Sequence, residues 1–92
     1  MIKVEKLEDV YPAIDELINQ LSNNDNAIIA RTIYHRMYKV SWSCRDELLE
    51  ELYQILNNVI ISNSNDLTLD IKQQIAEINN IIKNAIPIDN NV

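Results

Sequence analysis

Residues 67–86, with the sequence LTLDIKQQIAEINNIIKNAI, decide the fold of this chain. Their apolar side chains recur with spacings of four, three, four and three, at Ile71, Ile75, Ile78, Ile82 and Ala85. That spacing places them along one side of an α-helix, in the pattern of helices that pack nearly parallel to a partner. The seam is too short for a free coiled coil, so we expect packing within a bundle. Because proline disfavours a helical residue before it, the helix should end before Pro87.

Three more segments with helical periodicity lie toward the N-terminus. The first follows Asp9, a candidate N-cap, and holds Pro12 in its first turn. The third follows Ser43, another candidate N-cap, and its apolar arc is wide enough to contact two neighbours. We therefore predict an all-α fold, a small antiparallel bundle of four helices. The predicted helices cover residues 10–21, 27–40, 44–61 and 67–86.

The boundary between the second and third helices is ambiguous. Only Ser41-Trp42-Ser43 separates them, with no glycine or proline to force a turn, so one long helix over 27–61 is the alternative. Two helices are favoured, because the apolar stripe shifts by roughly 110° between the two halves. A helix of about 35 residues would also be long for a small domain.

Length and composition indicate a single domain over 1–92, with irregular ends at 1–8 and 87–92. Hydrophobic residues make up 47% of the chain, which suffices for a core. The lone cysteine excludes an internal disulfide, and neither a signal peptide nor an apolar run of about 20 residues is evident. These features predict a cytoplasmic protein that does not enter the membrane. The richness in isoleucine and asparagine suggests an AT-rich bacterial genome.

Charge is unevenly distributed along the sequence. The net charge is −6, yet the segment 26–45 contains four cations and no acid, so the rest carries four cations and fourteen acids, or −10. An acidic chain is not typical of a dedicated nucleic-acid binder, which has a basic footprint. The basic segment is therefore the compositional anomaly of this protein.

One side of the predicted second helix combines aromatic and cationic residues. Tyrosine, tryptophan and arginine are enriched at binding hot spots, because each joins a large contact area to a polar group. We interpret this side as a partner-binding face, and the alternative is that its rings belong to the core. The candidate residues are Arg31, Tyr34, His35, Tyr38 and Trp42.

The sequence contains no recognisable catalytic, cofactor or metal motif. Cys44 lies at the edge of an apolar arc, which predicts a buried and unreactive thiol. His35 is the only histidine, and one histidine with one cysteine cannot complete a zinc site. Phosphate-binding loops need glycine, which this chain lacks. We therefore expect neither an enzyme nor a cofactor.

The remaining function classes are ranked by the charge pattern. We expect a protein–protein interaction module, such as an immunity or antitoxin-like inhibitor, a regulator or an adaptor. The alternative is a homo-oligomeric structural helical protein, such as a homodimer. Weak nucleic-acid binding through the segment Arg31–Arg45 ranks below both.

Overall fold

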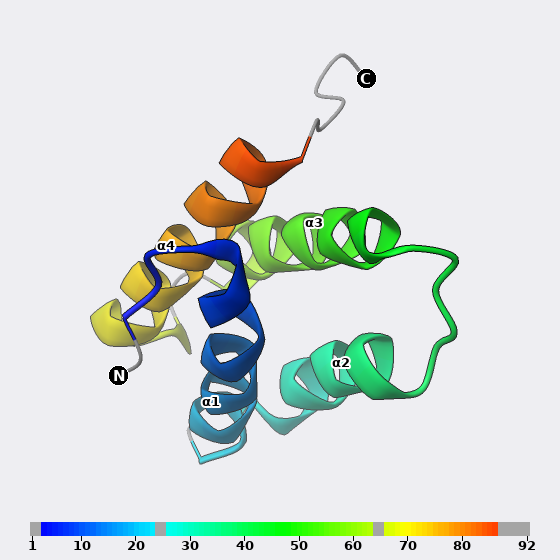
Figure 1. Cartoon of the computed structure of the whole chain (residues 1–92). Coiled ribbons are helices and arrows are strands. Elements are labelled where there is room, and N and C mark those ends of the chain that lie inside the picture. Colours follow the sequence, from blue (N-terminus) through cyan, green and yellow to red (C-terminus); the bar gives the residue numbers. More distant parts are fainter. Residues whose placement is uncertain (1–2, 24–25, 64–65, 87–92) are drawn as a thin grey trace.

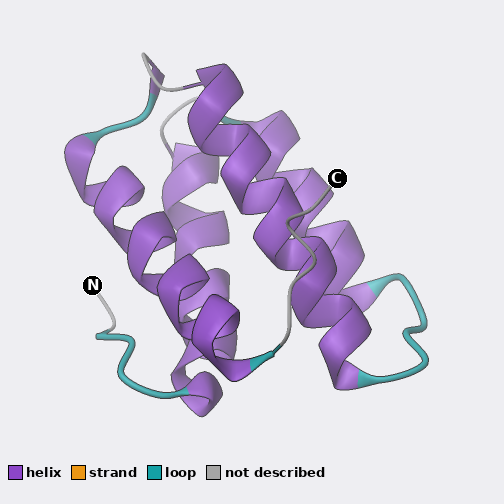
Figure 2. Ribbon diagram, turned by 90° about the horizontal axis from the view of Figure 1, so that it is seen from above, coloured by secondary structure: helices purple, strands orange, loops and turns teal. Residues whose placement is uncertain are grey.

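A computed structural model of the chain describes residues 3–23, 26–63 and 66–86. In this part of the chain every regular element is helical and no strand occurs (Figures 1 and 2). The prediction of an all-α, four-helix fold is thus confirmed. A 3-10 turn precedes the first helix, and the elements are η1 (Leu7–Asp9), α1 (Val10–Asn23), α2 (Ala27–Tyr38), α3 (Arg45–Asn63) and α4 (Leu69–Ala85).

The helix ends differ from the predicted ends by one or two residues. The first helix continues to Asn23 and the third to Asn63, because polar residues that can cap a helix can also extend its last turn. The second helix stops at Tyr38 rather than at residue 40. The fourth begins at Leu69, after Thr68, whose hydroxyl accepts a hydrogen bond from the Ile71 backbone N–H at 3.2 Å. Residues 87–92, predicted to be irregular, lie outside the described part.

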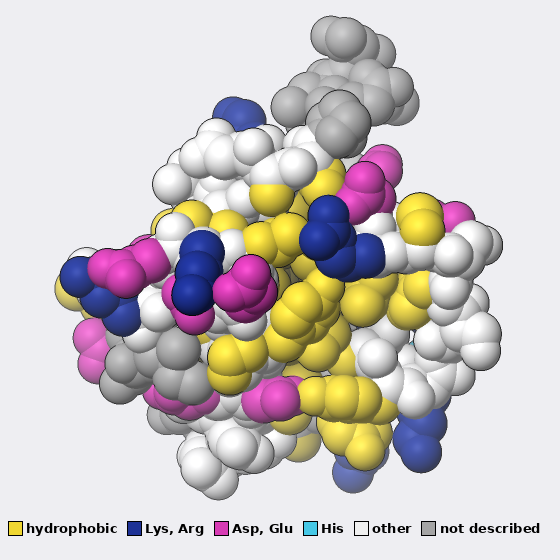
Figure 3. Space-filling model, viewed as in Figure 1, with side chains coloured by type: hydrophobic (Ala, Val, Ile, Leu, Met, Phe, Trp, Pro, Cys, Tyr) yellow, Lys and Arg dark blue, Asp and Glu magenta, His cyan; other side chains and the backbone are white. Residues whose placement is uncertain are grey.

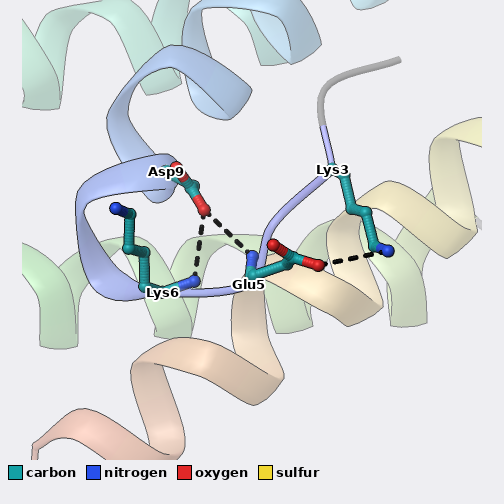
Figure 4. A network of polar contacts seen from close by, with 4 residues as sticks. All are labelled: Lys3, Glu5, Lys6 and Asp9. Carbon is teal, nitrogen blue, oxygen red and sulfur yellow. Dashed lines mark hydrogen bonds and ion pairs between the residues drawn. The ribbon is translucent and has the colours of Figure 1, made fainter.

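The prediction of an irregular N-terminal arm over residues 1–8 is wrong for Leu7 and Glu8, which belong to η1. Asp9 caps this arm rather than α1: its carboxylate accepts hydrogen bonds from the backbone N–H groups of Glu5 and Lys6, at 3.1 and 3.2 Å (Figure 4). The fold of the arm brings Val4 into the core, where it is buried. Asp9 therefore stabilises the turn that leads the chain into α1.

The four helices close into a ring in which each packs mainly against two others. α1 contacts α2 and α4, and α3 contacts the same two helices from the other side. Figure 1 shows α2 and α3 lying side by side and running in opposite directions, with α1 steeply inclined to both. The principal extents are 31 × 28 × 24 Å. No helix in the described ranges has the length and apolarity to cross a bilayer.

The core is supplied unequally by the four helices. Five of the fourteen α1 residues and six of the seventeen α4 residues are buried, whereas α2 buries only Ala30 and Ile33 of its twelve. The predicted seam of α4 is confirmed at its four isoleucines but wrong at Ala85, which is exposed while Ile86 is buried beyond the helix end. The poor burial of α2 leaves most of its side chains at the surface.

One polar pair lies within the apolar contact between α3 and α4. The Asn79 side-chain amide donates a hydrogen bond to Asn57 Oδ1 at 3.0 Å, and Asn79 is buried. The Asn79 amide nitrogen meets this acceptor in only one alignment of the two helices. This contact therefore favours the observed register of α3 against α4.

Removing a buried methyl-rich side chain from the seam should destabilise the whole domain. Ile75 is fully buried, so we expect Ile75→Ala to lower the free energy of unfolding by about 2–5 kcal/mol, from lost burial and from the cavity left behind. Leu69→Ala, on the exposed side of the same helix, should change it by less than about 0.5 kcal/mol. Urea unfolding followed by far-ultraviolet circular dichroism measures both, and equal effects would contradict the assignment of the seam.

Candidate functional site

Two tyrosines on α2 form a fixed aromatic pair at the surface. The ring centroids of Tyr34 and Tyr38 are 4.9 Å apart and the ring planes are tilted by 49°. The residues are 45% and 49% exposed, so these rings do not belong to the core. Two rings already in contact lose less conformational freedom when a partner covers them than two independent side chains would.

The pair is anchored to α1 through a single carboxylate. The Tyr38 hydroxyl donates a hydrogen bond to Asp15 Oδ1. This hydrogen bond, followed by partial burial and by the negative charge of Asp15, raises the pKa of Tyr38 to about 12. The neutral phenol is the form that can donate this bond, so it persists throughout the physiological pH range.

Beside the tyrosines, a hollow between α1 and α2 is bordered by two cationic side chains and one histidine. Arg31, His35 and Lys39 are all exposed. Ile18 of α1 and Ala30 of α2 contribute aliphatic side chains to the lining. The volume of the hollow is about 380 Å³. Its lining consists of Ile18, Ser22, Ala30, Arg31, Tyr34, His35 and Lys39.

The two cationic side chains of the hollow, Arg31 and Lys39, form no ion pair within the described part of the chain. The other two cations of the segment 26–45 are paired. Arg36 Nε lies 3.5 Å from Glu51 on α3, and Arg45 Nε lies 3.6 Å from Asp46. The unpaired positive charge of the segment therefore concentrates at the α1–α2 hollow.

The hollow and the tyrosine pair form one continuous surface. A second hollow, shared with Asp15 and Asn19 of α1, adjoins the first at Ile18 and Tyr34. Figure 3 shows apolar side chains over the junction of α1 and α2 with basic side chains below them. We call this the basic–aromatic surface, and it comprises Arg31, Tyr34, His35, Tyr38 and Lys39.

Trp42, the fifth predicted residue, has another position and another partner. It does not line the hollows around Arg31, Tyr34 and His35. Its ring is half-buried, and its indole N–H donates a hydrogen bond of 2.7 Å to the backbone carbonyl of Arg36. That carbonyl lies in the last turn of α2, where no backbone donor of the helix remains to bond it. Trp42 therefore caps the C-terminus of α2.

This cap also explains why residues 27–61 form two helices, as predicted. Lys39 makes the last helical bond, from its N–H to the His35 carbonyl at 2.8 Å, and the chain then leaves the helix. The indole takes the place of the next backbone donor. The connection after α2 has no glycine or proline, and the Trp42 side chain caps the helix end instead.

Sequence reasoning missed three contributors to the surface. Asp15 and Ile18 belong to α1, the helix before α2, and Lys39 was counted only for its charge. The contact between Asp15 and Tyr38 spans 23 positions, so no local spacing announces it. For Lys39, its position four residues after His35, at the C-cap of α2, was the available signal.

The predicted burial of Cys44 is wrong, because this residue is exposed. α3 begins one residue later than predicted, at Arg45, so Cys44 lies in the connection before the helix and not in its apolar arc. Within the described ranges, no group of three or more histidine, cysteine, aspartate or glutamate side chains is placed to hold a metal ion.

Comparisons of the chain with protein-family models, with curated proteins and with solved structures find no match. The site therefore has to be interpreted from its own geometry. An open, partly apolar surface with fixed rings and exposed cations can bind a complementary surface.

The titration of Tyr38 should depend on Asp15. With a pKa of about 12 in the folded chain and 10.0 when unfolded, Tyr38 contributes stability below pH 10 that is lost as the pH rises toward 12. We expect Asp15→Asn, which removes the negative charge, to bring the pKa of Tyr38 back toward 10.0. Ultraviolet titration of tyrosinate, with Tyr38→Phe to assign the signal, measures this. An unchanged curve in Asp15→Asn would rule out the anchor.

The capping role of Trp42 predicts a specific loss of stability. Trp42→Phe keeps an aromatic ring but removes the indole donor, leaving the Arg36 carbonyl without it. We expect the free energy of unfolding to fall by about 0.5–1.5 kcal/mol, the usual net contribution of one hydrogen bond. Ser41→Ala, an exposed change in the same connection, should have no measurable effect in the same urea experiment. Equal stability of Trp42→Phe and wild type would contradict the cap.

Proposed function

We propose that this protein acts by binding another protein, without catalytic activity, through the basic–aromatic surface. The observation that supports this is the tyrosine pair, held half-exposed by the contact between its tilted rings and by Asp15, next to two cations without ion-pair partners among the described residues. Folding alone gives no reason to fix large rings at the surface. A partner that covers them gains contact area at low cost in side-chain entropy.

The charge of the surface indicates the chemistry of the partner. Arg31 and Lys39 attract carboxylates, and the bare rings and Ile18 suit an apolar side chain between them. The partner patch should therefore be acidic with an apolar centre. The remaining faces of the chain, which carry the excess of acids, repel such a patch and so orient the encounter. An inhibitor, regulator or adaptor would fit this description.

Nucleic acid is the competing ligand for the cations. Arg31 and Lys39 could contact phosphates, but two of the four cations of the segment 26–45 are already paired with carboxylates. A phosphate backbone would also meet the acids elsewhere on a chain of net charge −6. The electrostatic argument therefore favours an acidic protein.

Substitutions in the basic–aromatic surface should weaken partner binding while preserving the fold. The first step is to capture a partner and to show by cross-linking that it contacts α2. We then expect Tyr34→Ala to raise the Kd of the complex about thirtyfold, a loss of about 2 kcal/mol in binding free energy. Arg31→Glu should slow association and reduce its salt dependence. Lys83→Glu makes the same charge change on α4 and should leave the Kd unchanged. Biolayer interferometry at several salt concentrations gives both quantities.

Two results would overturn this proposal. One is a partner whose Kd is indifferent to both Tyr34→Ala and Arg31→Glu, with the fold verified by circular dichroism. The other is salt-sensitive retention of a DNA duplex that Arg31→Glu abolishes, which would assign the surface to nucleic acid instead.

A further inference from the structure

The surface between α1 and α2 has two poles of opposite charge. The hollow that contains Arg31 and Lys39 has no carboxylate in its lining. The hollow that adjoins it, about 300 Å³ in volume, is lined by one carboxylate, that of Asp15, and by no basic residue. Ile18 and Tyr34 line both hollows. These two side chains therefore separate an acidic pole from a basic pole.

The negative charge of Asp15 is only partly used within the chain. Asp15 is exposed, its Oδ1 accepts the hydrogen bond from Tyr38, and no ion pair among the described residues involves its carboxylate. A neutral amide oxygen would also accept a hydrogen bond from the Tyr38 hydroxyl. Holding the tyrosine pair therefore does not account for a charge at this position.

The two poles also remain separate from each other. Asp15, Arg31 and Lys39 are all exposed, yet no ion pair in the described part of the chain joins Asp15 to either cation. Opposite charges that are held apart by apolar side chains do not neutralise one another by contact. Each pole is therefore available to a charge on a partner.

Charge complementarity over both poles restricts the chemistry of that partner. A wholly acidic patch would be attracted by Arg31 and Lys39 but repelled by Asp15, and juxtaposed like charges count against a complex. A phosphate backbone would meet the same repulsion. A patch that sets a cation opposite Asp15 is attracted at both poles. The acidic pole therefore favours a protein surface that carries both signs of charge.

We propose that Asp15 is the specificity determinant of this surface and selects a partner patch that is bipolar. An acidic group of the patch faces Arg31 and Lys39, and a basic group faces Asp15. An apolar side chain between them covers Ile18 and Tyr34, which line both hollows. This inference rests on the proposed function and adds to it the cation that the partner must carry.

Two helical peptides with blocked ends serve as probes of this selection. A helix can present one row of leucines with a row of charged side chains along each side. In the bipolar peptide, glutamates line one side and lysines line the other. In the acidic peptide, glutamates line both sides. Nuclear magnetic resonance titration of the isotope-labelled full chain at low salt gives each Kd and shows whether signals of α1 and α2 shift.

The sign of the response to Asp15→Asn tests the proposal. Asparagine keeps an oxygen that can accept the hydrogen bond from Tyr38 but carries no charge. We expect the Kd of the bipolar peptide to rise about threefold, because a surface ion pair is lost. The Kd of the acidic peptide should fall about threefold, because a repulsion is removed. A general loosening of the fold would instead weaken both complexes.

Glu77→Gln is the matched control. Glu77 is exposed on α4 and lines neither hollow, and its substitution changes the net charge by the same amount. The Kd of each peptide should stay close to that of wild type. Tyr38→Phe removes the hydrogen bond but keeps the charge of Asp15, so the preference for the bipolar peptide should persist in this variant.

Several outcomes would overturn the selection by Asp15. One is a Kd of the bipolar peptide that falls or stays constant in Asp15→Asn. Others are a wild-type chain that prefers the acidic peptide, or one that binds neither peptide. The proposed function is tested separately, by the response of a captured partner to Tyr34→Ala and Arg31→Glu. A partner that responds to both, yet binds Asp15→Asn more tightly than wild type, would retain that function and exclude the selection.

Discussion

The burial of one face of α4 is the constraint on which the rest of the structure depends. Ile71, Ile75, Ile78 and Ile82 occupy the space between α1 and α3 and close the ring of helices. Burying each side chain contributes about 1.5–3 kcal/mol relative to leaving it in water, as an upper estimate. The Asn57–Asn79 pair then selects the register of this contact. In a chain of 92 residues, few other side chains could replace this burial.

The same arrangement leaves α2 as the helix with the least to bury. α4 packs against α1 and α3 on one side of the ring, and α2 packs against the same two helices on the other side. Only Ala30 and Ile33 of α2 are buried. Its remaining large side chains fall on two flanks, one facing α1 with tyrosines and cations, the other facing α3 with isoleucines. The proposed partner-binding surface lies on α2 because the core leaves most of this helix exposed.

Trp42 illustrates why residue type alone does not identify a binding residue. Tryptophan is enriched at interfaces because it joins a large ring to one polar donor, and the same combination suits a helix cap. Here the donor meets the Arg36 carbonyl, so the indole ends α2 and fixes the connection to α3. Tyr38 has an equivalent ring and a polar tip, but its hydroxyl reaches a carboxylate on another helix, and about half of the residue stays exposed. The partner of the polar atom distinguishes the two roles.

The amino-acid sequence by itself determined the all-α class, the four helices to within about two residues, the seam of α4 and the basic segment on an acidic chain. These are local properties, since periodicity and charge are set by residues a few positions apart. Tertiary structure alone decided the bond between Asp15 and Tyr38, the cap from Trp42 and the exposure of Cys44. Each depends on which helices become neighbours and where a chain leaves its helix. Contacts between residues distant in sequence fix those choices, and no local pattern records them.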